Sequence, residues 1–236
     1  MRSLASREDI QRPISLINPK SPLTESYRTL RTNIQFASVA EDTKVVLVTS
    51  TAPGEGKTST STNLAVVAAA ANKKVLLIDA DMRKPQVHQR FQVSNLIGLS
   101  TLLIKERSLQ DCIVSSGAEN LYLLTSGPIP PNPAEMLASR AFAELVDVLR
   151  SQFDMIVIDS PPVLSVSDTL ALSHIADGVL FVVDSQKTHR LHAKRAVQAL
   201  MQVEARILGV VLNRVKHNRK DSYYYSYYTA GTPVIS

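Results

Sequence analysis

The amino-acid sequence predicts an α/β protein with a doubly wound, mostly parallel sheet. Short aliphatic runs alternate with longer amphipathic stretches along most of the 236 residues. This pattern is typical of strands that are buried on both faces and joined by crossover helices. A glycine loop follows the first aliphatic run, at the end of a strand where such sheets bind ligands. Hydrophobic residues make up 44% and charged residues 20% of the chain, which excludes a disordered or collagen-like protein.

Each expected element has its own signal along the chain. A helix over 23–37 precedes the first aliphatic run, and a second helix over 58–71 starts at the glycine loop. A third helix over 133–152 opens with Pro133, a residue suited to a first helical turn. The helices over 58–71 and 133–152, and a last one over 189–204, lie between expected strands and are long enough for crossovers. The aliphatic runs are the expected strands, at 44–50, 74–79, 121–125, 155–159, 178–184 and 207–213.

The two ends of the chain differ from its middle. Residues 1–22 contain three prolines and no clear periodicity, and the residues from 216 onward show no core pattern. We therefore expect an extended N-terminal arm over 1–22, one P-loop domain over 23–215 and a flexible, tyrosine-rich tail over 216–236. The length of the middle segment fits one large domain.

The composition favours the cytoplasm. The single cysteine, Cys112, cannot form an intramolecular disulfide, and no N-terminal stretch resembles a secretion signal. The longest aliphatic run, 64–71, is far shorter than the roughly 20 apolar residues that cross a bilayer. The net charge is +5, and basic residues gather near the C-terminus. Such a cluster suits nucleic acid, anionic lipid or solvent, so charge alone selects no partner.

The strongest motif is an apolar strand followed by a glycine loop and a helix start, over residues 46–58. In a P-loop, backbone N–H groups cradle phosphates, the lysine offsets phosphate charge and the hydroxyl residue binds magnesium. Thr51 stands where the general pattern has glycine. The alternative is a plain glycine turn that happens to contain Lys-Thr. The expected nucleotide-binding residues are Pro53, Gly54, Glu55, Gly56, Lys57, Thr58 and Ser59.

Three aspartates follow aliphatic runs. Asp79 and Asp81 come at the end of the second expected strand, and Asp159 ends the run over 155–159. Because the carboxyl ends of parallel strands meet at one edge of a sheet, these acids can converge on the P-loop. Asp159 fits a Walker B acid that holds magnesium, and Asp79 or Asp81 fits the acceptor of a hydroxyl proton. A single aspartate in such a place is as often a loop cap.

These motifs together resemble the bacterial tyrosine kinases. The segments 52–58, 79–83 and 158–162 match the Walker A, A′ and B motifs of that family, and the likeness extends over residues 20–230. The resemblance implies ATP and Mg²⁺ as cofactors. It assigns catalysis to Lys57, Asp79, Asp81 and Asp159, and the metal to Thr58, Asp81 and Asp159.

Two other segments match family features. Glu25, Arg28 and Arg31 fit the Glu-x-x-Arg-x-x-Arg motif through which family members form rings, and helical spacing places the three on one face. An ordinary charged helix face is the alternative. Asn213, followed by Arg214, resembles the strand end where related proteins read adenine with an asparagine amide, a group that both donates and accepts. A turn-capping asparagine is the alternative.

The tail has the most unusual composition of the chain. Five of the seven tyrosines fall within six positions: Tyr223, Tyr224, Tyr225, Tyr227 and Tyr228. The resemblance implies an autophosphorylation cluster that is presented to a neighbouring subunit. A peptide that docks on a partner or stacks on bases is the alternative.

The resemblance implies a cytoplasmic ATP-dependent protein-tyrosine kinase of the Gram-positive type, which regulates capsular and extracellular polysaccharide synthesis. The implied partners are a transmembrane activator of polysaccharide export that recruits the chain to the inner membrane face, other subunits in a ring, tyrosine-bearing substrates and a phosphotyrosine phosphatase. Nucleic acid is not expected. The rival function is a partitioning or cell-division ATPase, but such proteins carry a signature lysine where this chain has Ala52.

Overall fold

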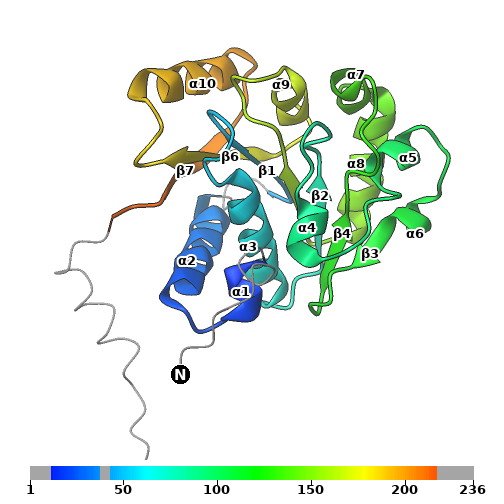
Figure 1. Ribbon diagram of the computed structural model, residues 1–236, viewed down its shortest axis with the longest axis horizontal. Helices are drawn as coiled ribbons and strands as arrows, with labels where there is room; N and C mark the ends of the chain where they lie inside the picture. Colours follow the sequence, from blue (N-terminus) through cyan, green and yellow to red (C-terminus); the bar gives the residue numbers. More distant parts are fainter. Residues whose placement is uncertain (1–11, 38–42, 217–236) are drawn as a thin grey trace, which may run out of the picture.

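The computed structural model describes residues 12–37 and 43–216. Within them one sheet has the strand order β3-β4-β2-β5-β1-β6-β7 (Figure 1). All neighbouring strands are parallel except β3 and β4. The strands are β1 (Val45–Ser50), β2 (Val75–Asp79), β3 (Ile113–Ser115), β4 (Leu121–Leu124), β5 (Met155–Asp159), β6 (Gly178–Asp184) and β7 (Ile207–Asn213).

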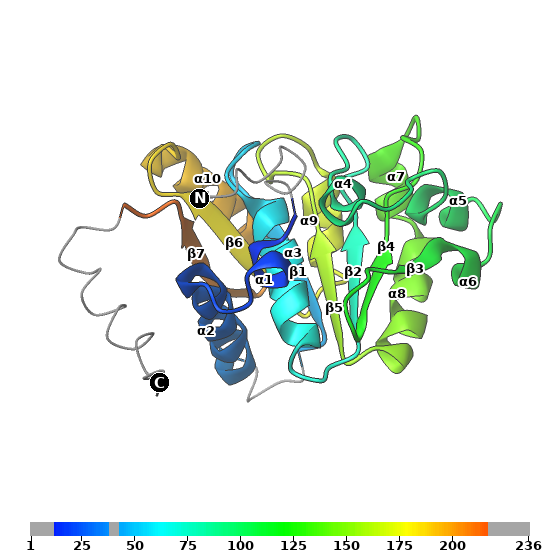
Figure 2. The ribbon, with the colours of Figure 1, turned by 60° about the horizontal axis from the view of Figure 1, so that its bottom comes forward.

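Helices cover both faces of this sheet (Figures 1 and 2). On one face lie α1 (Ile14–Ile17), α2 (Pro22–Ala37), α3 (Lys57–Ala69) and α4 (Val87–Phe91). The helices α8 (Arg140–Gln152), α9 (Asp168–Ser173) and α10 (Arg190–Gln202) pack on the other face. The same core takes in three short helices, α5 (Leu99–Leu103), α6 (Leu109–Cys112) and α7 (Pro133–Leu137).

The strands supply alternate residues to the two cores, as the period of two in a strand requires. In β1, Val46 and Val48 belong to the core that contains α3, whereas Val45 and Leu47 belong to the core that contains α8, α9 and α10. The residues of β1, β2 and β5 are buried throughout. This explains why these strands read as continuous aliphatic runs rather than alternating ones.

The expected α/β fold with a doubly wound, mostly parallel sheet is confirmed. The six expected strands match the structure to within one residue at each end. The short antiparallel strand β3 was not expected, because its three residues are only partly buried and carry no aliphatic run.

Two expectations about helices are wrong. The segment 133–152, expected as a single helix, forms two helices, α7 and α8. Ser139 follows α7 and is the N-cap of α8, where its side-chain oxygen accepts a hydrogen bond from the N–H of Phe142 at 3.2 Å. The extended arm over 1–22 contains α1, and the backbone N–H of Ser15 donates to Asn63 Oδ1 of α3 at 2.8 Å. Burial of Pro13 and Ser15 therefore docks this segment on the domain.

No helix in the ranges 12–37 and 43–216 has the length and apolar character needed to pass through a membrane. The strand order places β5 between β1 and β2. The carboxyl ends of these three strands are therefore neighbours, and they carry the glycine loop, Asp159 and Asp79.

At the opposite edge of the sheet, Asp177 ties three elements together. Its Oδ2 accepts the backbone N–H groups of Lys44 and Val45 at 2.8 and 2.7 Å, at the start of β1. Its carboxylate also binds the Arg150 guanidinium of α8 at 2.8 Å. Arg150 in turn donates to the Ile175 carbonyl at 2.8 Å.

We predict that Asp177→Ala lowers the free energy of unfolding by about 2–3 kcal/mol, because charge-assisted hydrogen bonds are lost and backbone donors are left unpaired. Asp147→Ala is the matched control, since Asp147 contacts the same Arg150 at 3.8 Å from an exposed position. That change should cost less than about 0.5 kcal/mol. Urea denaturation measures both, and equal stabilities of the two variants would contradict the assignment.

Candidate functional site

The glycine loop joins the carboxyl end of β1 to the first turn of α3. Gly54 and Gly56 have φ values of 82° and 103°, a left-handed conformation that suits glycine. A Cβ atom on Gly56 would also lie 2.0 Å from the amide nitrogen of Asn213. The loop leads directly into the first turn of α3, and the N–H groups at the N-terminus of a helix stabilise an anion.

The helix that follows the loop is buried almost entirely, although its first half is polar. Its hydroxyl and amide side chains bond back to the preceding turn, as Thr62 does to the Thr58 carbonyl at 2.7 Å and Asn63 to the Ser59 carbonyl at 2.7 Å. This satisfies polar groups that would otherwise be costly to bury. These side-chain bonds therefore fix the first two turns of α3 next to the carboxyl end of β1.

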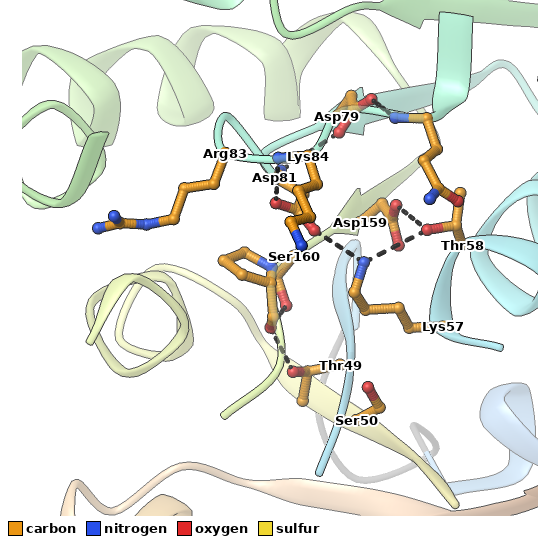
Figure 3. Close-up of polar contacts among 12 residues, drawn as sticks. Thr49, Ser50, Lys57, Thr58, Asp79, Asp81, Arg83, Lys84, Asp159 and Ser160 are labelled. Carbon is orange, nitrogen blue, oxygen red and sulfur yellow. Dashed lines mark hydrogen bonds and ion pairs between the residues drawn. The ribbon is translucent and has the colours of Figure 1, made fainter. Parts of the chain in front are cut away.

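The three aspartates and the P-loop lysine meet at this edge (Figure 3). Asp79 and Asp159 are direct neighbours in the parallel register of β2 and β5. Lys57 Nζ donates to Asp81 Oδ2 at 2.9 Å, and the Thr58 hydroxyl donates to Asp159 Oδ2 at 2.7 Å. All five side chains belong to buried residues. The sequence motifs of residues 52–58, 79–83 and 158–162 therefore form one cluster.

The electrostatics of this cluster follow from burying three carboxyl groups beside one ammonium. The pKa of Asp79 is raised to about 8, first by burial and then by the charge of Asp159. Burial is also the main cause that raises the pKa of Asp159, against the charge of Lys57. Burial alone would lower the pKa of Lys57, but the charges of Asp159 and Asp81 outweigh it and raise that pKa. The cluster is short of positive charge.

The three aspartates have different surroundings. Asp79 accepts backbone N–H groups from Asp81, Gln86 and Val87 at 3.2, 3.0 and 2.9 Å. It therefore shapes the loop between β2 and α4. Asp81 instead lines a cavity of about 310 Å³ beside the P-loop. Of these two aspartates, only Asp81 lines the cavity.

This cavity is lined by the P-loop, the loop after β2, the loop after β5, Arg90 of α4 and Arg214 after β7. Its cationic lining residues are Lys57, Arg83, Lys84, Arg90 and Arg214. Arg83 points away from the aspartate cluster in Figure 3 and holds the buried Asp168 at the start of α9 through two bonds of 2.9 and 3.0 Å. Positive charge thus surrounds a cavity that has Asp81 in its wall.

The remaining nucleotide-site candidates divide into two groups. Pro53, Gly54 and Ser59 line the same cavity, whereas the carboxylate of Glu55 accepts the N–H of Thr51 at 2.8 Å and does not line it. Asn213 lies in an adjoining cavity of about 260 Å³, together with Tyr27.

Asn213 is bonded at both ends of its amide. It donates to the Glu55 carbonyl at 2.9 Å and accepts the N–H of Arg214 at 2.9 Å. These bonds use one of its two N–H donors and one of its two oxygen lone pairs. Arg214 lines both cavities.

The assembly motif lies on α2, apart from the aspartate cluster. Glu25 and Arg28 pair with each other on the exposed side, whereas Arg31 donates to the Val67 carbonyl in the last turn of α3 at 3.0 Å. Glu25 and Arg28 are thus paired within α2, whereas Arg31 also connects α2 to α3. The tail tyrosines Tyr223, Tyr224, Tyr225, Tyr227 and Tyr228 lie outside the described residues.

Several residues near the site were not among the expected ones: Arg83, Lys84, Arg90, Asp168, Asp184 and Thr188. Asp184 had a readable signal, because it ends an aliphatic strand as Asp79 and Asp159 do. The others sit in loops or short helices, where no periodicity marks them.

Comparison with known proteins agrees with this geometry. A family model described as an AAA domain matches residues 43–207. The tyrosine-protein kinase YwqD of Bacillus subtilis is 46% identical over 90% of this chain and 90% of its own length. The crystal structure of the chimerical protein CapA2B2 is 43% identical with a TM-score of 0.83, covering 86% of this chain and 90% of that one.

The rival function also has a structural relative, but a more distant one. The cell division ATPase MinD of Pyrococcus furiosus is 25% identical with a TM-score of 0.64, covering 75% of this chain and 74% of that one. The tyrosine-protein kinases match more of the chain, at higher identity and with a closer fold. With its Walker A, A′ and B segments joined in one buried cluster, the chain belongs to the family of bacterial tyrosine-protein kinases.

Proposed function

We propose that the cavity beside the P-loop binds the phosphates of ATP with Mg²⁺, and that the chain transfers the γ-phosphoryl group to tyrosine hydroxyls. The observation that carries this proposal is the meeting of Lys57 and the start of α3 with Asp81 and Asp159. Lys57 would offset charge on the transferred group, as phosphoryl transfer depends mainly on positioning and electrostatic stabilisation.

The residues present fit magnesium. Asp159 Oδ1 is buried and meets no hydrogen-bond partner, while its other oxygen binds the Thr58 hydroxyl. In the part of the chain that the structure describes, no three acidic, histidine or cysteine side chains are arranged to hold a metal alone. Magnesium at phosphate sites needs only one or two carboxylates, because phosphates and water complete its shell. Thr58 and Asp159 would hold the ion, with Asp81 beside it on Lys57, and the ion would supply charge compensation at the phosphates.

Asp81 is the proposed acceptor of the tyrosine proton. Its Oδ1 accepts the N–H of Lys84 at 3.0 Å and its Oδ2 accepts Lys57, so the carboxylate is fixed in the cavity wall. The tyrosine oxygen forms a bond to the γ-phosphorus of ATP, while the bond from that phosphorus to the oxygen bridging to the β-phosphate breaks. The hydroxyl proton goes to Asp81. Asp79, enclosed by backbone donors, positions this loop.

The adjoining cavity suits the nucleoside. Asn213 keeps one donor and one acceptor beyond its two bonds, which is what the edge of adenine requires. The aromatic ring of Tyr27 lies in the same cavity wall. This supports ATP as the phosphoryl donor.

The substrates and partners are proposed from the sequence and from family membership. The chain phosphorylates its own tail in trans at Tyr223, Tyr224, Tyr225, Tyr227 and Tyr228, within a ring that uses Glu25, Arg28 and Arg31. A transmembrane partner brings it to the inner membrane face and activates it, a phosphatase reverses the modification, and the cycle regulates capsular or extracellular polysaccharide synthesis. The proposed division of the chain is an N-terminal arm over 1–22, a kinase domain over 23–215 and a tail over 216–236.

Lys57→Met should reduce tail phosphorylation by roughly a thousandfold, because the charge that stabilises the transferred phosphoryl group is lost. Lys194→Met, at an exposed position of α10, is the control and should retain activity. Mass spectrometry of residues 217–236 after incubation with ATP and magnesium measures both. Comparable phosphorylation of the two variants would contradict the P-loop assignment.

Asp159→Asn should remove the gain in nucleotide affinity that magnesium provides, since the amide replaces a charged ligand. The measurement is the dissociation constant of a fluorescent ADP analogue with magnesium and with a chelator. The ratio of the two constants should fall towards one in the variant. A ratio like that of the unchanged protein would show that Asp159 has only a structural role.

Transfer between subunits can be tested by mixing an inactive chain that carries the tail with an active chain that lacks it. Lys57→Met protein with an intact tail is incubated with active protein that lacks residues 221–236. Phosphate should appear on the Lys57→Met chain, because only that chain carries the tyrosines. An unmodified tail in this mixture, with normal phosphorylation of the intact active protein, would establish transfer within one chain instead.

A further inference from the structure

The P-loop departs from its general pattern at Thr51, and the structure shows what replaces the missing glycine. The backbone N–H groups of Thr51 and Ala52 donate to Glu55 Oε2 at 2.8 and 3.1 Å. The side chain of Glu55, in the middle of the loop, therefore binds the backbone at the beginning of the same loop. Glu55 is only 4% exposed, so this carboxylate depends on protein donors rather than water.

The same carboxylate is also held from outside the loop. Its Oε1 accepts a hydrogen bond from the hydroxyl of Thr188, which is 133 residues away. The Thr188 oxygen in turn accepts the backbone N–H of Asp184 at 3.0 Å. This second bond orients the hydroxyl: one lone pair of the oxygen accepts the N–H of Asp184, and the hydroxyl proton is directed at Glu55.

The ends of β6 and β7 hold the loop at two more points. Arg214 donates to the Gly54 carbonyl at 2.9 Å and pairs with the buried carboxylate of Asp184. Asn213 donates to the Glu55 carbonyl at 2.9 Å. Four atoms of the loop, two carbonyl oxygens and both oxygens of one carboxylate, are thus bonded by the protein itself.

The direction of the Glu55 side chain matters for phosphate binding. A carboxylate inside a phosphate loop would repel the ligand if it faced the cavity. Glu55 is absent from the cavity wall, whereas its neighbours Gly54 and Gly56 are part of it. The Thr188 contact therefore keeps a negative charge turned away from the phosphates.

We propose that Glu55, Thr188, Asp184 and Arg214 form a brace that holds the P-loop in its phosphate-binding conformation, with the Glu55–Thr188 contact as its central link. They are positioning residues, and the inference rests on the proposed nucleotide site. A loop that is ordered beforehand binds more tightly, because the ligand does not have to provide the free energy of ordering.

The test compares threonine variants by direct binding of a fluorescent ADP analogue. Thr188→Val keeps the volume but removes the hydroxyl, and it should weaken binding about tenfold, the effect of roughly one hydrogen bond. Thr188→Ser should restore near-normal affinity. Thr125→Val is the matched control, because Thr125 is also buried and its hydroxyl donates to the Ile97 carbonyl at 3.1 Å, outside both cavities. That variant should bind the analogue as the unchanged protein does.

A double-variant cycle identifies the contact. Glu55→Ala combined with Thr188→Val should bind no more weakly than Glu55→Ala alone, since both changes remove the same link. In kinase assays the KM for ATP should rise in Thr188→Val with little change in kcat, as expected for lost ground-state binding. Additive losses in the cycle would refute the link.

The remaining outcomes separate the brace from the nucleotide site. If the unchanged protein does not bind the analogue, the proposed nucleotide site itself is refuted. If it binds and Thr188→Val binds equally well, only the brace is refuted. Thermal unfolding without nucleotide checks that each variant folds. Should Thr188→Val fail to fold, Asp184→Asn tests the Asp184–Arg214 part of the brace instead, with weaker binding expected and unchanged binding refuting the brace.

Discussion

The ammonium group of Lys57 is the interaction on which the carboxyl edge of the sheet depends. Asp79 and Asp159 are adjacent by strand register, and Asp81 follows within two residues. Burial first, and the charges of neighbouring carboxylates after it, raise the pKa values of Asp79 and Asp159, so that their charged forms are costly here. Lys57, bonded to Asp81, supplies the opposite charge. Three carboxyl groups beside one ammonium leave a deficit of positive charge that suits a cation.

The helix α3 carries this lysine and connects it to the rest of the molecule. Its first turn forms the phosphate site, its middle is bound by α1 through Ser15 and Asn63, and its last turn is bound by α2 through Arg31 and Val67. Two elements expected to be an arm and an assembly helix are thus packed directly on the phosphate-binding helix. Arg31 supplies a donor to a carbonyl near the end of α3, where helices are favoured by positive charge.

Much of this arrangement could be predicted because its signals are local. The strands of the sheet centre are aliphatic throughout, since helices cover both of their faces. The P-loop and the acids after β2 and β5 are short motifs at strand ends, and a parallel sheet brings such ends to one edge. Local signals failed at Ser139, where a cap interrupts a helical pattern, and at Ser15, whose burial depends on Asn63 of another helix.

The sequence by itself determined the α/β class, the strand positions, the phosphate loop and the set of acids that surrounds it. Each of these is encoded by residues close together in the chain, through periodicity or through a fixed spacing of residue types. Only the tertiary structure decided what each side chain contacts: that Asp81 binds Lys57 while Asp79 binds backbone, that Arg31 turns inward, and that Glu55 meets Thr188. These partners are separated by up to 133 residues, and their meeting is set by strand order, register and loop paths, which no local pattern specifies.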